Sequence, residues 1–74
     1  MARFLHLIKR DSPPLAADIV ARQLQESGVE VTVVLLDGAA PHLPAGVAVK
    51  RLGADLDHDK LLDLIFESDH VVTW

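Results

Sequence analysis

Two kinds of hydrophobic pattern alternate along this chain. Residues 4–8, FLHLI, form a short and mostly apolar run that stops at two cations. A short continuous apolar run predicts a strand that is covered on both faces of a sheet. Residues 29–36, VEVTVVLL, form a second run that is rich in β-branched side chains, which predicts a second strand at the centre of the same sheet.

Between these two runs the apolar positions follow a helical spacing. The residues in this spacing are Leu15, Ile19, Val20 and Leu24. They predict a helix over about 13–27. Ser12 is a suitable N-cap, the prolines at 13 and 14 are tolerated in a first helical turn, and Gly28 is expected to cap the other end. Strand, helix and strand together predict a βαβ unit with parallel strands.

The second half of the chain gives a weaker version of the same order. Residues 37–46 contain two glycines and two prolines, and we expect a loop there with at most one helical turn. Residues 47–52 predict a modest strand and residues 70–73 a final one. Between them we expect a helix that Asp57 caps and that ends near Ser68.

The resulting order, β-α-β-loop-β-α-β, predicts one α/β domain over residues 1–74. It consists of a small, mostly parallel four-stranded sheet with two helices. The helices lie either on one face of the sheet, which leaves the other bare, or on opposite faces, which leaves each face half covered. In both arrangements the chain has more apolar side chains than two helices can hide.

Composition adds that the core is thin and has no covalent support. A domain of 74 residues buries only about 60% of the surface that its unfolded chain exposes. Half of the residues are apolar and none is cysteine, so the chain has no disulfide, no cysteine-bound metal and no thiol chemistry of its own. A partner subunit is the usual way to complete so small a core.

Charge and hydropathy exclude two classes of partner. The net charge of −4 and the pI near 5.3 argue against direct binding of nucleic acid, which requires a basic face. No apolar run approaches the roughly 20 residues of a membrane span, and the first residues lack the features of a signal peptide. We therefore expect a soluble, cytoplasmic protein.

The best candidate for a polar site lies beyond the carboxyl ends of the first two strands, where open parallel sheets bind ligands. The residues there are Lys9, Arg10, Ser12, Asp37 and Gly38. They could hold a small anion or contact a partner. Alternatively, the two cations are solvated, the serine only caps the helix, and Asp37-Gly38 is only a tight turn. No glycine-rich phosphate loop is present, and we assign no catalytic residue.

The four histidines do not predict a metal site, because no pair of them has metal-ligand spacing on one helix. We expect neither a metal nor a cofactor. His6 lies in a buried-looking strand and is interpreted as a hydrogen-bonded histidine of the core or of an interface. Trp74, the only tryptophan, is a further candidate interface residue, since tryptophan is enriched at interface centres.

Three stretches of the chain resemble a known superfamily. They are FLHLIKRDSP at the start, LLDGAA at the end of the second strand, and LDHDKLLDLIFESDHVVTW at the end. Together they are similar to DsrE/DsrF/DsrH proteins, and most similar to the DsrH (TusB) branch, in which a helix leads to a short strand that closes on a tryptophan. The resemblance implies a DsrE-like fold in which the last strand closes the sheet at Trp74. Typical members are longer and have a helix where this chain has residues 38–47.

The resemblance also implies a function. Members of the superfamily relay sulfur through a cysteine persulfide, and this chain has no cysteine, so no catalytic residue carries over. The expectation is a non-catalytic subunit of a sulfur-relay complex with DsrE- and DsrF-like partners, in tRNA 2-thiouridylation or in sulfur oxidation. The alternative is a free-standing homo-oligomer that binds a small anion at Lys9, Arg10 and Ser12, or a scaffold without a ligand.

Overall fold

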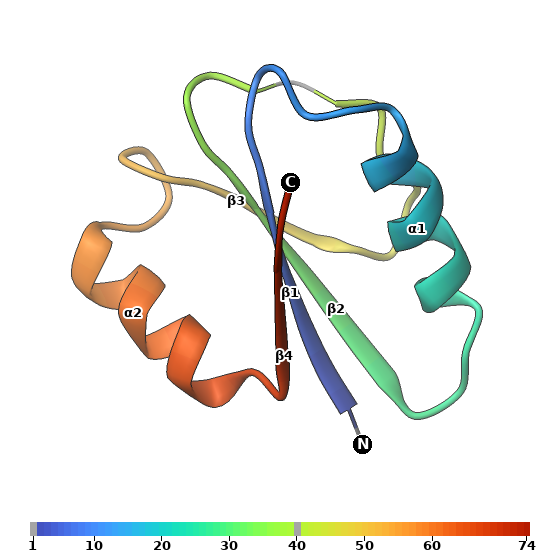
Figure 1. Cartoon of the computed structure of the whole chain (residues 1–74). Coiled ribbons are helices and arrows are strands. Elements are labelled where there is room, and N and C mark those ends of the chain that lie inside the picture. The colour runs from blue at the N-terminus through green and yellow to red at the C-terminus, as the bar shows by residue number, and fades with distance from the viewer. Residues whose placement is uncertain (1, 40) are drawn as a thin grey trace.

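Four parallel strands and two helices make up the fold, as the hydrophobic pattern predicts. The computed structural model describes residues 2–39 and 41–74. The elements in chain order are β1 (Ala2–Ile8), α1 (Leu15–Leu24), β2 (Val29–Leu35), β3 (Ala48–Arg51), α2 (His58–Glu67) and β4 (His70–Thr73) (Figure 1). The predicted α/β class and the predicted element order are confirmed.

The strands lie in the order β3-β2-β1-β4, and every neighbouring pair is parallel. The two most apolar runs of the sequence therefore occupy the centre, where both faces of a strand can be covered. In the register, His6 lies between Val33 of β2 and Val72 of β4. β4 pairs only with β1, so the last strand forms an edge of an open sheet.

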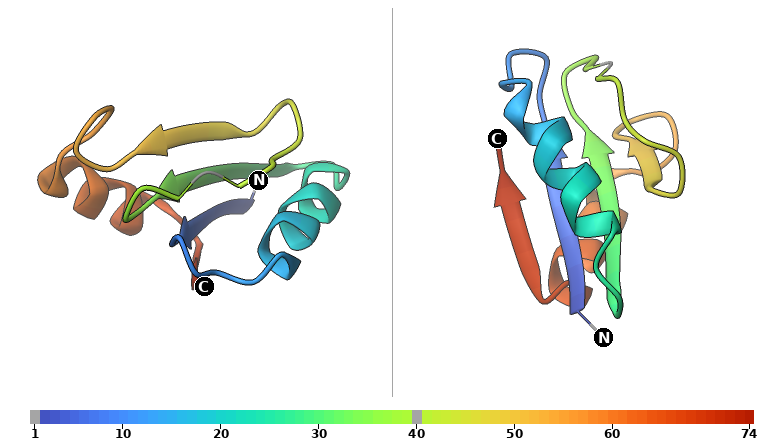
Figure 2. Two further views of the ribbon diagram at one scale, coloured as in Figure 1. Left: turned by 90° about the horizontal axis from the view of Figure 1, so that it is seen from above. Right: turned by 90° about the vertical axis from the view of Figure 1, so that its right-hand side faces the viewer.

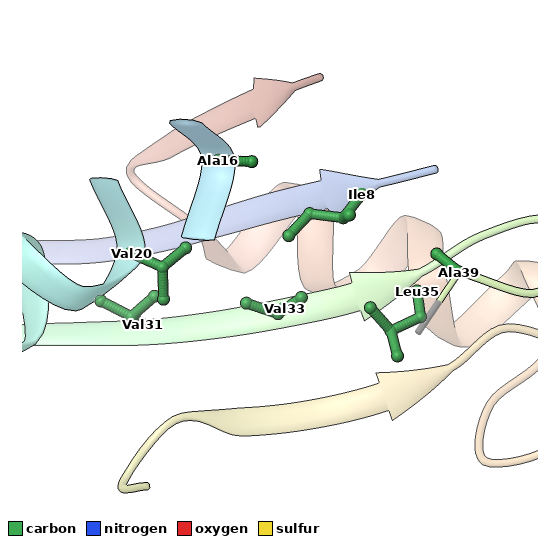
Figure 3. Close-up of a cluster of buried hydrophobic side chains, with 7 residues drawn as sticks. All are labelled: Ile8, Ala16, Val20, Val31, Val33, Leu35 and Ala39. Carbon is green, nitrogen blue, oxygen red and sulfur yellow. The ribbon is translucent and has the colours of Figure 1, made fainter. Parts of the chain in front are cut away.

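The two helices lie on opposite faces of the sheet (Figure 2). On one face, α1 packs over β1 and β2, and the buried cluster there is Ile8, Ala16, Val20, Val31, Val33, Leu35 and Ala39 (Figure 3). On the other face, the buried cluster is Leu5, Val34 and Leu56, and the α2 residues packed against it are Leu61, Leu64 and Ile65. Of the two arrangements open at the level of sequence, the structure has the one in which each helix covers part of its own face.

Spacing explains why one helix cannot cover a face. Four strands about 4.8 Å apart place the two edge strands about 14 Å from each other. Packed helices lie about 8–10 Å apart, so each face of this sheet has room for two helices and holds one.

Helix α1 begins later than the sequence predicts, at residue 15 rather than 13. Its N-cap is Pro14, which makes no side-chain hydrogen bond, so the prediction that Ser12 caps the helix is wrong. Ser12 and Pro13 each precede a proline, and a residue in that position is pushed away from helical dihedral angles. The Pro13-Pro14 pair therefore lies before the helix.

Helix α1 also ends earlier than predicted, at Leu24, with Gln25 as its C-cap. Leu24 is the last α1 side chain that packs against the core, and only polar residues follow it before the glycine. Gly28 is not the helix cap. With φ of 77° it makes the turn into β2, and its carbonyl accepts a hydrogen bond of 2.8 Å from the Ala2 N–H.

Helix α2 follows the sequence closely. Asp57 caps it, because its Oδ1 accepts a hydrogen bond of 2.9 Å from the Lys60 N–H. The helix ends at the Ser68 C-cap, whose hydroxyl donates to the Leu64 carbonyl at 2.7 Å. Between β2 and β3 the described residues form turns and irregular structure without a helical turn, and residue 40 lies outside the described residues.

Candidate functional site

The polar positions after β1 surround a hollow of about 320 Å³ at the carboxyl ends of the central strands. Lys9, Arg10 and Ser12 line one side of it, together with the prolines and the first turn of α1. Pro41 and His42, from the loop after β2, line the opposite side. The volume is at the lower end of the range for small-molecule sites, about 300–1,000 Å³, so the hollow has room only for a small ligand.

The first wall of the hollow is a tight turn over residues 9–12. The Lys9 N–H donates to the Ser12 Oγ at 2.8 Å, and the Ser12 N–H donates back to the Lys9 carbonyl at 3.2 Å. This pair of bonds fixes the turn and holds Arg10 at its exposed tip. Ser12 is therefore a loop-forming residue, and its backbone N–H is already occupied.

The amino end of α1 has few backbone donors for an anion. Residues 13 and 14 are prolines without an N–H, and the Ala16 and Ala17 N–H groups donate to the Pro13 and Pro14 carbonyls at 3.0 and 3.2 Å. An anion in the hollow would therefore depend on the side chains of Lys9, Arg10 and His42. His42 could not be identified as part of this site from the sequence, because its position beside Lys9 and Arg10 depends on how the two loops fold together.

Asp37 and Gly38 form the tight turn that follows β2. The Ala39 N–H donates to the Leu36 carbonyl at 3.0 Å, and the two central residues have φ angles of 56° and 70°. The Arg10 guanidinium lies against this turn: a Cβ built on Gly38 would be 3.2 Å from its Nη2. Arg10 and Asp37 form no salt bridge, and Asp37 does not line the hollow. Three of the five predicted residues thus share the hollow, and Gly38 leaves room beside it for Arg10.

A second cluster of polar atoms lies inside the molecule, around His6. The His6 side chain is fully buried on the α1 face. Its Nδ1 is 3.0 Å from the Trp74 Nε1, and its Nε2 is 2.6 Å from the Gln23 Oε1. An indole N–H can only donate, so Nδ1 accepts and the ring proton is on Nε2, from which it is donated to Gln23. The histidine is therefore neutral, and both of its ring nitrogens are satisfied.

This cluster joins three parts of the chain: strand β1, helix α1 and the residue that follows β4. The Trp74 backbone N–H also donates to the Leu7 carbonyl at 3.1 Å, and its indole ring packs against the α1-face core. His6 is therefore a core residue with no exposed surface for a partner, whereas Trp74 is half-buried. Gln23 was not identified from the sequence. Its position three residues after the buried Val20 is the only indication that it lies near the core.

Over residues 2–39 and 41–74, no three histidine or carboxylate side chains come together as a metal site would require. Asp57 is occupied as a helix cap, and the His70 ring stacks on the Phe4 ring with their centroids 4.8 Å apart. Within that same part of the chain, no helix has the length and apolar character needed to cross a membrane.

Large apolar side chains remain exposed where no helix lies over the sheet. On the α1 face the exposed residues are Leu15 of helix α1 and Val49 of edge strand β3. On the α2 face, Val71 of edge strand β4 is 39% exposed, and the α2 residues Leu62 and Phe66 are 51% and 83% exposed. Exposed apolar residues that lie close together, unlike scattered ones, mark interaction surfaces.

No family model, no curated protein and no solved structure matches this chain. The resemblance to DsrH-type subunits thus depends on the three stretches quoted above. The first of them covers β1 and the turn beside the hollow, the second covers the end of β2 and the Asp37-Gly38 turn, and the third covers α2 and β4.

Proposed function

We propose that this chain is a non-catalytic subunit that acts by binding other proteins, in a sulfur-relay complex of the DsrEFH/TusBCD type. The observation that carries this proposal is the half-covered sheet, with Phe66 83% exposed on the α2 face. A folded domain that leaves large apolar side chains in water gains stability when another protein covers them. The resemblance supplies the class of partner, namely cysteine-bearing DsrE- and DsrF-like subunits.

The absence of cysteine assigns the chemistry to those partners. A persulfide needs a thiolate, and this chain has none, so the sulfur is carried by the other subunits while this chain holds them in place. In this role the subunit serves either tRNA 2-thiouridylation or the oxidation of reduced sulfur compounds, in the cytoplasm.

Deletion of the gene in its own host tests the proposed function. We expect the loss of 2-thiouridine from bulk tRNA, or the loss of growth on reduced sulfur compounds, and restoration of either by the wild-type chain. Incubation of the purified complex with a persulfide donor, followed by intact-mass measurement, should add sulfur to the partner subunits and none to this chain. Unchanged tRNA and unchanged sulfur metabolism in the deletion strain would refute the proposal.

A second candidate function is the binding of a small anion, and the observation that favours it is the hollow lined by Lys9, Arg10 and His42. Titration with inorganic phosphate and with sulfate tests it, followed through changes in the amide chemical shifts of residues 9–12 and 15–17. If the hollow binds an anion, these changes in chemical shift should be absent from a Lys9→Met/Arg10→Met double variant. Binding that the double variant retains would rule the hollow out as the site.

A further inference from the structure

The uncovered half of the α2 face is wide enough for one further helix. Helix α2 packs on β1 and β2 through Leu61, Leu64 and Ile65, and neither Val71 nor Thr73 of β4 belongs to the buried cluster on that face. We define the β4 seat as the surface formed by Leu62, Phe66, Val71 and Thr73, all of which are exposed. Figure 2 shows β4 at the edge of the sheet, with α2 on the side opposite α1.

The orientation of α2 places its exposed apolar residues at this seat. Lys60, Asp63 and Leu64 share a hollow with the β3 residue Lys50, so that flank of the helix faces β3. At 100° per residue, Leu62 is about 160° and Phe66 about 120° around the helix from Lys60, both away from the β3 flank, and so they lie on the side toward β4. Their i, i+4 spacing makes them one continuous ridge, the shape that packs into a groove of a second helix.

The charge around the ridge is negative. Helix α2 carries three carboxylates and one cation, and that cation, Lys60, lies on the β3 flank. Asp59 is one turn from Leu62 and borders the ridge on its solvent side, whereas Asp63, one turn from Phe66, lies between the ridge and the hollow that it shares with Lys60 and Lys50. No basic residue lies in the last turn of the helix.

We infer that the β4 seat binds an amphipathic helix of a partner subunit, an inference that rests on the proposed function. The apolar face of that helix covers Leu62, Phe66 and Val71, and its lysines or arginines lie opposite Asp59 and Asp63. A second copy of this chain is disfavoured, because two α2 helices packed on each other would bring these carboxylates together. A helix fits better than an added strand, because the exposed apolar residues lie on a face rather than along an edge.

A pair of designed peptides tests the chemistry of the seat directly. The probes are a labelled amphipathic Leu–Lys peptide and its Leu–Glu counterpart, titrated with the full chain and followed by fluorescence anisotropy. We expect the Leu–Lys peptide to bind, more weakly as salt rises, and the Leu–Glu peptide not to bind. Phe66→Asp should weaken the binding about tenfold or more, since an exposed aromatic anchor is typical of an interface hot spot.

Val49→Asp is the matched control, because it makes the same kind of change at an exposed apolar residue of the opposite face. It should leave the affinity for the Leu–Lys peptide within about twofold. Neither side chain belongs to the buried clusters, so both variants should keep the wild-type circular dichroism spectrum. Equal loss in both variants, or equal binding of both peptides, would overturn the inference.

Photo-crosslinking in the host identifies the natural occupant. A benzophenone side chain in place of Phe66 should form an adduct that maps to a basic helix of a cysteine-bearing subunit. An adduct with a second copy of this chain would overturn the inference. If such a subunit binds but Phe66→Asp does not weaken the complex, the seat is wrong and the proposed function stands. If the Leu–Lys peptide binds but no such subunit does, the seat stands and the sulfur-relay assignment fails.

Discussion

At the scale of single residues, the His6 imidazole shows how one buried polar side chain fixes its neighbours. It is fully buried, so each ring nitrogen needs a partner, and the two partners come from positions 17 and 68 residues away. Local patterns in the sequence cannot contain such pairs. The sequence therefore predicts that His6 is hydrogen-bonded, and only the fold shows that its partners are Gln23 and Trp74.

Replacing the tryptophan by phenylalanine tests this cluster. Trp74→Phe keeps an aromatic ring but removes the indole N–H, so the buried His6 Nδ1 loses its donor. We expect the free energy of unfolding to fall by about 1–3 kcal/mol, the cost of an unsatisfied buried polar atom. In a His6→Leu background the same change should cost less than about 1 kcal/mol, because no acceptor remains. Urea denaturation followed by circular dichroism measures both, and an equal cost in the two backgrounds would contradict the assigned hydrogen bond.

At the scale of elements, the hydrophobic pattern predicts the order and type of every helix and strand, because each pattern reports which side of an element is buried. Helix ends are less predictable, as the two N-termini show. Asp57 stands one residue before its helix and caps it, whereas the Pro13-Pro14 pair separates Ser12 from α1. A cap residue is informative only when the dihedral angles that follow it are free to become helical.

Two alanine variants compare these termini. Asp57→Ala removes the acceptor of the Lys60 N–H, and we expect it to lower the free energy of unfolding by about 1 kcal/mol, a typical N-cap value. Ser12→Ala should cost less than about 0.5 kcal/mol, because it loses only a bond within an exposed loop. Denaturant midpoints measure both, and hydrogen exchange of the Lys60 amide should be faster in Asp57→Ala alone. A larger loss for Ser12→Ala would mean that Ser12 stabilises α1 after all.

At the scale of the whole molecule, the fold is an open sheet with one helix on each face and two edge strands. The sequence predicts an excess of apolar side chains, but it does not predict where the excess lies. That depends on the strand order, which places β3 and β4 at opposite edges and leaves Val49 and Val71 on opposite faces. The candidate anion site is likewise only partly predictable: Lys9, Arg10 and Ser12 could be identified from the sequence, whereas His42 could not.

Sedimentation equilibrium of the full chain, alone and with the DsrE- and DsrF-like subunits of its own host, tests most directly whether this fold is completed by other proteins. We expect the chain to enter one heteromeric species with those subunits at micromolar concentration. Phe66→Asp should shift the equilibrium toward free subunits, and Val49→Asp should not. A chain that stays a folded monomer over the whole concentration range, with or without the other subunits, would contradict the interpretation of its exposed apolar surface as a binding surface.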